Sequence, residues 1–199
     1  IFLPRSKLNF AENLLSKNNE EKAITFISEN GYREEKSWKE LKSNTLKFIN
    51  FLNENKIKEK DRIAAYTVNQ IETVEGFLAT SAIGAIWSSC SPDFGTQGVI
   101  ERFSQIKPKL LIITDRYYYN GKEINIIDRL PAILKKIKSI KSVLIINYPG
   151  KKNLKQKKVK GVKFFYYNKL KDSKEKKFHF KKFDFDKELA ILYSSGTTG

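Results

Sequence analysis

Between residues 62 and 146, short apolar runs alternate with longer stretches in which apolar residues recur at helical spacing. The run at residues 109–114 is almost continuously apolar, which is typical of a strand buried on both faces of a parallel sheet. Strands are predicted at residues 62–67, 85–88, 109–114 and 142–146. Helices are predicted at residues 72–83 and 127–140. A further helix is predicted to run through Val99, Phe103 and Ile106 and to stop at Pro108. This alternation predicts a layered α/β fold with a mainly parallel sheet flanked by helices.

The first 55 residues predict a helix, a hairpin and a second helix. Residues 8–15 place apolar side chains at helical spacing, and residues 23–28 have the composition of a strand. The Asn-Gly pair at residues 30–31 is expected to supply both positive-φ residues of a tight turn, with the return strand starting at residue 32. The Ser and Glu that bound residues 37–40 have the spacing of a capping box. The stripe that follows is predicted to be core: Leu41, Thr45, Phe48, Ile49 and Leu52.

The last eleven residues place an apolar run directly before a segment that contains only Ser, Thr and Gly. Residues 189–193 have the length and composition of a buried strand. Residues 194–199 offer hydroxyls, freely bent backbone and successive N–H groups, which suit an anion that the main chain must approach closely. A strand that leads into such a loop predicts a nucleotide-phosphate site. The alternative is a flexible turn, because Ser/Thr/Gly runs also form ordinary linkers.

The formal net charge of +16 is concentrated in one segment. Residues 135–187 hold 19 lysines and four acidic residues, whereas the rest of the chain is nearly balanced. Only six of the 38 basic residues are Arg, the side chain whose bidentate fork suits recognition of bases and phosphates. We therefore interpret the lysines as a solvated surface and keep a basic nucleic-acid-binding module as the alternative from a different class.

The same segment predicts little regular structure. Residues 151–160 form a basic loop, residues 162–167 have a strand-like composition, and residues 172–182 form another charged connection. We interpret them as insertions over a continuing domain and not as a domain boundary.

One cysteine and one histidine, Cys90 and His179, exclude several kinds of chemistry. A disulfide framework and a Cys/His zinc site cannot be built from them, and a Ser-His-Asp or Cys-His site is disfavoured. Cys90 is expected to be buried and inert, and Trp87 to serve packing. The longest apolar candidate, residues 76–87, is interrupted by Thr80, Ser81 and Gly84 and is too short to span a membrane. A soluble, cytoplasmic protein is predicted.

The Ser/Thr/Gly segment resembles the phosphate-binding signature of the adenylate-forming enzymes, the family of acyl-CoA synthetases, luciferases and peptide-synthetase adenylation domains. In the central block at residues 79–95, the sequence Trp-Ser-Ser-Cys-Ser-Pro-Asp-Phe-Gly is similar to the branch of this family that activates acetoacetate. Residues 8–15, 102–109 and 119–122 agree with the same branch. The resemblance runs from near residue 2 to residue 199 and is poor across residues 151–187.

The resemblance implies an ATP-dependent acid–CoA ligase. It would use ATP and CoA as substrates, Mg²⁺ as cofactor and acetoacetate as the favoured acid. It implies that the small-molecule substrates are the partners, with no nucleic acid and no membrane. It assigns ATP phosphate contacts to one segment: Ser194, Ser195, Gly196, Thr197, Thr198 and Gly199. Thr197 and Thr198 would lie nearest the β,γ-phosphates and the Mg²⁺, and Lys122, with Arg116 nearby, would meet the nucleotide phosphate of CoA. The alternative within the class is another short-chain acyl-CoA synthetase that uses acetate or propionate.

The resemblance also concerns how much of a domain the chain contains. The chain begins at Ile1 without a methionine and stops inside the phosphate loop, so we expect a fragment. Residues 1–199 would be the incomplete N-terminal part of an AMP-binding domain. The rest of that large domain, the C-terminal domain and the catalytic residues, including the adenylation lysine, would lie downstream, and the fragment alone would be inactive.

Overall fold

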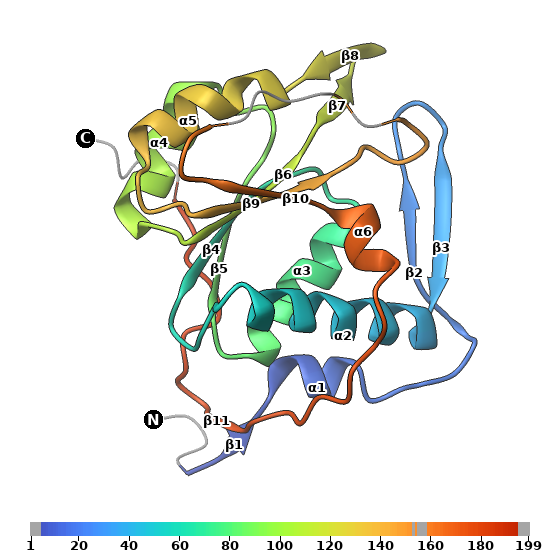
Figure 1. Cartoon of the computed structure of the whole chain (residues 1–199). Coiled ribbons are helices and arrows are strands. Elements are labelled where there is room, and N and C mark those ends of the chain that lie inside the picture. The colour runs from blue at the N-terminus through green and yellow to red at the C-terminus, as the bar shows by residue number, and fades with distance from the viewer. Residues whose placement is uncertain (1–4, 153, 155–158, 195–199) are drawn as a thin grey trace.

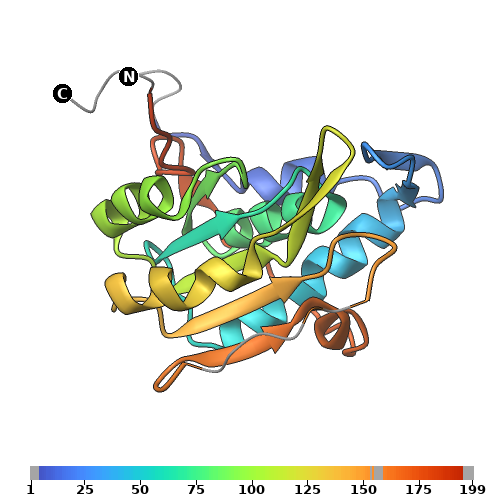
Figure 2. The same ribbon diagram turned by 90° about the horizontal axis from the view of Figure 1, so that it is seen from above.

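The structure, a computed structural model, describes residues 5–152, 154 and 159–194. At its centre lies a sheet of five strands in the order β10-β9-β6-β4-β5, with every neighbouring pair parallel. The strands are β4 (Arg62–Tyr66), β5 (Ile86–Cys90), β6 (Leu110–Thr114), β9 (Ser142–Ile146) and β10 (Lys163–Tyr166). Helices cover both faces of this sheet (Figures 1 and 2). The predicted layered α/β architecture is confirmed.

The two faces of the sheet carry separate apolar clusters. One face is covered by α1 (Phe10–Leu14), α2 (Trp38–Glu54), α3 (Ile71–Ala82) and α6 (Tyr167–Lys171). The other is covered by α4 (Thr96–Ile106), the 3₁₀ turn η1 (Ile127–Arg129) and α5 (Leu130–Lys136). Alternate residues of β6 enter the two clusters, Leu110 and Ile112 on one side and Leu111 and Ile113 on the other. Burial on both sides explains why β6 is apolar throughout.

The strand order creates a switch point at β4. The two strands that follow it in the sequence, β5 and β6, lie on opposite sides of it. The connection from β4 to β5 and the connection from β5 to β6 therefore run in opposite directions across the sheet. In open α/β sheets, ligands bind in the crevice outside the carboxyl ends of the strands at such a point. The topology therefore directs attention to the residues that follow β4 and β6.

The N-terminal elements form largely as their sequence predicts. α1 is capped by Asn9, and a hairpin pairs β2 (Lys22–Ile27) with β3 (Arg33–Ser37). The capping box of α2 is confirmed, because the Ser37 hydroxyl accepts from the Glu40 N–H and the Glu40 carboxylate accepts from the Ser37 N–H. The predicted stripe of α2 is also confirmed, since all five of its residues are buried.

The prediction of a positive-φ pair at Asn30-Gly31 is wrong. Ile27 pairs with Arg33, so the loop holds five residues instead of two. Only Gly31 has a positive φ there (80°), and the side chains of Ser28 and Asn30 accept from the N–H of Tyr32. Loop length decides the turn, because a two-residue loop is what requires positive φ at both positions.

Such a two-residue turn lies elsewhere, in a hairpin that the sequence analysis missed. This hairpin joins β7 (Arg116–Tyr119) to β8 (Lys122–Asn125), and Tyr119 pairs directly with Lys122. Asn120 and Gly121 between them have φ values of 50° and 71°. The hairpin leaves the carboxyl end of β6 and projects beyond the sheet (Figure 1).

The helix predicted at residues 127–140 is shorter than expected. It starts as η1, and α5 ends at Lys136 because Ile137 leaves the helical conformation at φ −99° and ψ 81°. Ile137 and Ile140 are nevertheless buried. The chain therefore bends to bring both side chains into the core before β9 begins, and tertiary packing overrides the helical periodicity.

The prediction that residues 189–193 form a buried strand is also wrong. This segment forms a single parallel bridge, between Trp87 and Ala190, at the β5 edge. The N–H of Trp87 donates to Leu189, and the N–H of Ile191 donates to Trp87. Ala190 is exposed, and Leu192 is 82% exposed, since the segment packs on the rest of the described chain along one side only.

The lysine-rich part contains more regular structure than the sequence predicted. β10 confirms the strand expected at residues 162–167, but the short helix α6 directly after it was not predicted. Further on, β11 (Phe183–Asp184) pairs antiparallel with β1 (Lys7–Leu8). The lysine-rich part thus contributes β10 to the central sheet and places β11 beside β1.

Candidate functional site

The carboxyl ends of β4 and β6 lie side by side at the switch point. The chain leaves β4 through Thr67 and Val68, and the N–H of Val68 donates to the hydroxyl of Thr114 at the end of β6 (3.4 Å). Gln70, the N-cap residue of α3, donates to the carbonyl of Asn147 beyond β9 (3.5 Å). Three buried oxygens here have no partner among the described residues, namely Thr67 Oγ1, Gln70 Oε1 and Glu72 Oε2. This edge therefore offers hydrogen-bonding groups that the described fold does not use.

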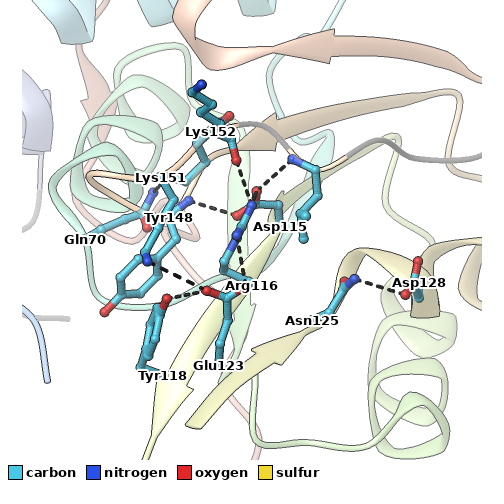
Figure 3. Close-up of polar contacts among 12 residues, drawn as sticks. Gln70, Asp115, Arg116, Tyr118, Glu123, Asn125, Asp128, Tyr148, Lys151 and Lys152 are labelled. Atoms are coloured by element: carbon cyan, nitrogen blue, oxygen red, sulfur yellow. Dashed lines mark hydrogen bonds and ion pairs between the residues drawn. The ribbon is translucent and has the colours of Figure 1, made fainter. Parts of the chain in front are cut away.

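Asp115 fixes the chain on both sides of this edge (Figure 3). Its side chain is fully buried, and one carboxylate oxygen accepts from the N–H of Tyr148 (2.9 Å). The other accepts from the N–H of Leu154 (3.3 Å) and from the Arg116 guanidinium (3.1 Å). Its backbone carbonyl accepts from the N–H groups of residues 126 and 127, just before α5. One residue thus holds the start of the β7–β8 hairpin, its end and the loop after β9.

The guanidinium of Arg116, one of the predicted CoA contacts, is already engaged within the fold. It donates to Asp115, to Glu123 on β8 (2.9 Å) and to the carbonyl of Lys152 (2.7 Å). Burial alone would lower its pKa, but the carboxylates of Asp115 and Glu123 outweigh that effect and raise the pKa of Arg116. The structure therefore brings Arg116 into a buried ion-pair network that shapes the hairpin.

Lys122, the other predicted CoA contact, is exposed at the start of β8. On the same hairpin, the Tyr118 hydroxyl donates to Glu123, and this bond, together with the charge of Arg116, lowers the pKa of Glu123. The ammonium of Lys151 lies 5.4 Å from the centre of the Tyr118 ring. The hairpin thus presents cationic and aromatic groups beside the carboxyl edge of the sheet. The CoA roles of Lys122 and Arg116 stay predictions.

A cavity of about 310 Å³ lies between this hairpin and the ends of β4 and β5. Its volume falls at the lower end of the range for small-molecule sites. One wall is the first strand of the hairpin, a second is the turn after β4, and a third is the segment from the end of β5 through Asp93. The walls are built from residues 67–69 and 73, residues 89–93 and residues 117–119.

The predictions for Cys90 and Trp87 are confirmed. Cys90 is buried at the cavity wall, and burial raises the pKa of its thiol to about 11. A thiol with that pKa is not ionised at neutral pH and is a poor nucleophile. Trp87 is also buried, and its ring packs edge-on against Phe77 at 5.9 Å between centroids. Both residues therefore serve packing.

The predicted phosphate loop begins at the same edge of the sheet. Of its residues only Ser194 is described, and Ser195, Gly196, Thr197, Thr198 and Gly199 lie outside the described residues. Ala190 pairs in parallel with Trp87, so Ser194 and Ser91 each lie four residues further toward the carboxyl edge. The preceding residue, Tyr193, donates from its hydroxyl to the carbonyl of Arg102 on α4 (2.7 Å). The ATP contacts themselves stay a prediction.

A buried charge cluster beside a second cavity escaped the sequence analysis. Glu75 is fully buried and accepts from Lys36 (3.2 Å), from Asn44 (3.0 Å) and from the hydroxyl of Tyr167. Glu72, one turn away on α3, borders a cavity of about 720 Å³. Burial raises the pKa of Glu72 to about 7. Two glutamates three residues apart in an otherwise uncharged helix were the signal in the sequence.

The described residues lack two kinds of feature. No helix in residues 5–152, 154 and 159–194 is long and apolar enough to cross a membrane. The same residues contain no group of three or more His, Cys, Asp or Glu side chains placed to hold a metal ion.

Comparison with known proteins places these observations in context. Residues 12–199 match the model of the family described as "AMP-binding enzyme". The chain is 38% identical, over 100% of its length, to acetoacetyl-coenzyme A synthetase from Rhizobium meliloti, and 36% identical, over 98%, to acetoacetyl-CoA synthetase from Gallus gallus. It spans about 30% of the length of both relatives. The solved acetoacetyl-CoA synthetase from Streptomyces lividans superposes on 97% of the chain with a TM-score of 0.85 and 29% identity, and 29% of that structure is covered.

Proposed function

Because the chain belongs to the AMP-binding enzyme family, we propose that the protein carrying it is an ATP-dependent acid–CoA ligase that forms acetoacetyl-CoA from acetoacetate. The observation that carries this proposal is the identity of 36–38% with two acetoacetyl-CoA synthetases over nearly the whole chain. The similarity extends to the fold, since the solved acetoacetyl-CoA synthetase structure superposes on 97% of the chain. We propose that the chain supplies the N-terminal part of the AMP-binding domain.

The proposed reaction has two steps. An oxygen of the acetoacetate carboxylate attacks the α-phosphorus of ATP, the bond to the β-phosphate breaks, and acetoacetyl-adenylate and pyrophosphate result. The thiol of CoA then loses its proton and attacks the acyl carbon, and AMP leaves with the electrons of the bond that linked it to the acyl group. The net products are acetoacetyl-CoA, AMP and pyrophosphate. Acetate or propionate in place of acetoacetate is the alternative.

We propose that residues 194–199 bind the phosphates of ATP in the first step. Negative charge moves onto the departing pyrophosphate, so N–H groups and hydroxyls aimed at it stabilise the transition state more than bound ATP. The position of Ser194, four residues past the bridge with Trp87 at the carboxyl edge, supports this assignment. Thr197 and Thr198 are the hydroxyls that would face the β,γ-phosphates. Mg²⁺ would neutralise phosphate charge beside them, and its ligands would be phosphate and hydroxyl oxygens.

We propose that the second step takes place at the cavity beside the β7–β8 hairpin. Lys122 is exposed on that hairpin and is free to meet the nucleotide phosphate of CoA. Arg116 is the weaker candidate, because a direct contact with CoA would require it to leave Glu123 or the carbonyl of Lys152. Its more direct contribution is to hold the hairpin in place for Lys122.

The test is AMP release by the purified full-length protein with ATP, CoA and one acid at a time. Acetoacetate should support the reaction with the highest kcat/KM, and acetate and propionate should be much poorer. Preference for acetate or propionate would favour the alternative acid, and the absence of AMP with every acid would refute ligase activity. In the same protein, Thr197→Val should lower acetoacetate-dependent pyrophosphate exchange about a hundredfold. Unchanged exchange would refute the assignment of Thr197.

A further inference from the structure

The backbone of the segment that joins β5 to α4 is held by Arg129. The guanidinium Nη1 of Arg129 has three acceptors within hydrogen-bond distance, which share its two hydrogens: the carbonyl of Pro92 (3.2 Å), the carbonyl of Phe94 (3.0 Å) and the hydroxyl of Tyr66. The two carbonyls belong to residues two apart in the sequence, and both point toward the same nitrogen. Two backbone dipoles turned to one point repel each other unless a positive group lies between them, and Arg129 supplies that group.

Tyr66 completes the arrangement from the end of β4. It is fully buried, and its hydroxyl lies within hydrogen-bond distance of the carbonyls of Phe94 (2.6 Å) and Pro92 (3.1 Å). A phenol has one hydrogen to donate, so it can satisfy only one of the two carbonyls at a time. Arg129 is therefore needed for the other, and charged donors form the stronger bonds.

The position of Arg129 is itself well determined. It is the last residue of η1 and the N-cap of α5. The preceding residues, Ile126 and Ile127, donate their N–H groups to the carbonyl of Asp115 at the carboxyl end of β6. The guanidinium thus reaches from a fixed point on the α5 side of the sheet to the segment that follows β5.

This segment forms a wall of the cavity beside the hairpin, through Ser91, Pro92 and Asp93. The Asp93 carboxylate also interacts with Tyr117 on the hairpin, and it raises the pKa of that phenol after the larger effect of burial, while Arg129 lowers it. Arg129 therefore lies between two walls of the same cavity. Among the described residues that line this cavity, none belongs to the predicted phosphate loop.

We propose that Arg129, acting with Tyr66, is a positioning residue that fixes residues 91–94 as the wall against which CoA binds. The inference rests on the proposed ligase function. It assigns Arg129 to the thioester-forming step and leaves the adenylation step independent of it. Without the guanidinium, one of the two carbonyls loses its partner, and the backbone of the wall rotates to hydrate it.

The test compares both half-reactions in the full-length protein. Arg129→Met keeps the length of the side chain but removes its donors, and it should raise the KM for CoA about tenfold, the loss expected for a hydrogen bond to a charged group. Acetoacetate-dependent pyrophosphate exchange, which needs no CoA, should stay within about twofold of wild type. Arg129→Lys should recover part of the affinity, because an ammonium donates to the same carbonyls.

A matched control separates positioning from general stability. Arg62 is the first residue of β4, the strand that ends at Tyr66. Its Nε donates to the carbonyl of Ile106, at the opposite end of the sheet from Arg129. Arg62→Met should lower the melting temperature without changing the KM for CoA. Hydrogen exchange gives a readout besides activity, since Arg129→Met should increase exchange at Asp93 and Phe94 and Arg62→Met should not.

The outcomes are distinguishable. An unchanged KM for CoA in Arg129→Met, or an equal loss in pyrophosphate exchange and thioester formation, would overturn the inference about Arg129. If the wild-type protein showed no pyrophosphate exchange with acetoacetate, acetate or propionate, the proposed ligase function would instead be refuted. The assignment of the wall to CoA would then be refuted as well.

Discussion

Glu72 should make the protein less stable as the pH rises, and its replacement by Gln should remove that effect. Its side chain lies on α3 beside Glu75, with one carboxylate oxygen unpartnered among the described residues. Burial is the largest cause of its raised pKa; Lys36 opposes the rise, and Glu75 and Glu34 add to it. The neighbours thus offset one another in part, and desolvation decides the outcome.

The magnitude follows from the difference between the two states. The pKa of Glu72 rises from 4.5 to about 7 on folding, which corresponds to about 3 kcal/mol. Between these values the folded state binds more protons than the unfolded state, so the free energy of unfolding falls as the pH rises. The stability is fully present below about pH 4.5 and is lost by about pH 7. Glu72→Gln cannot lose a proton and should gain up to about 3 kcal/mol over wild type across this interval.

The assay is urea denaturation at a series of pH values from about 4.5 to 8, for wild type and Glu72→Gln. The quantity of interest is the difference in unfolding free energy between the two proteins, because other titrating groups cancel in it. Glu175→Gln, on the exposed connection after α6, is the control and should give a flat difference. A flat difference for Glu72→Gln as well would refute the argument, since it would mean that Glu72 is ionised in the folded protein at the same pH as in the unfolded one.

Three further predictions concern the hairpin and its anchor. Asp115→Asn breaks a buried ion pair with Arg116 and should lower the free energy of unfolding by about 3–5 kcal/mol, measured by thermal or chemical denaturation; a loss below about 1 kcal/mol would contradict the anchoring role. Gly121→Ala places a Cβ in open space but at φ 71° and should lower the free energy of unfolding by about 1 kcal/mol; an unchanged free energy of unfolding would contradict the backbone-strain argument. Lys122→Glu should raise the KM for CoA and leave pyrophosphate exchange unchanged, and an unchanged KM would remove Lys122 from the CoA site.

Local signals in the sequence were sufficient for the elements that depend on local interactions. The capping box at Ser37 and Glu40 involves four consecutive residues, and the apolar run of β6 reports burial on both faces of one strand. Such features carry their cause within a short window of sequence. The sheet and most of its covering helices were therefore predictable.

The errors arose where a distant segment decides the outcome. Residues 189–193 are as apolar as a core strand, but their place beside the β5 edge leaves Leu192 exposed. Asn-Gly occurs at residues 30–31 and at residues 120–121, and the pairing of the flanking strands, not the dipeptide, determines which one forms the two-residue turn. Asp115 could not be identified as an anchor, because its partners lie up to 39 residues away in the sequence.

The same limit applies to the candidate site. The resemblance placed Lys122 near Arg116, but only the fold shows that the guanidinium is bound to Asp115 and Glu123. The contribution of Arg129 had no signal in the sequence at all, since a lone arginine at a helix start is common. Its role depends on two backbone carbonyls from another connection, and backbone orientation is not encoded in residue type.

Arg102 extends this reasoning to the relation between the two proposed steps. Its guanidinium lies 4.1 Å from the centre of the Phe94 ring and 5.8 Å from that of Tyr193. Phe94 belongs to the segment that Arg129 holds, and Tyr193 directly precedes the predicted phosphate loop. Each contact contributes about 0.5–1 kcal/mol or more, so one side chain on α4 supports both the CoA-side wall and the stem of the ATP loop.

Arg102→Met should therefore impair both half-reactions, in contrast to Arg129→Met. Loss of two cation–π contacts should reduce pyrophosphate exchange and raise the KM for CoA by about two- to fivefold each. Arg102→Lys keeps a cation over both rings and should retain most of both activities. If Arg102→Met changed the KM for CoA alone, Tyr193 would not transmit the position of α4 to the phosphate loop, and the two substrate sites would be supported independently.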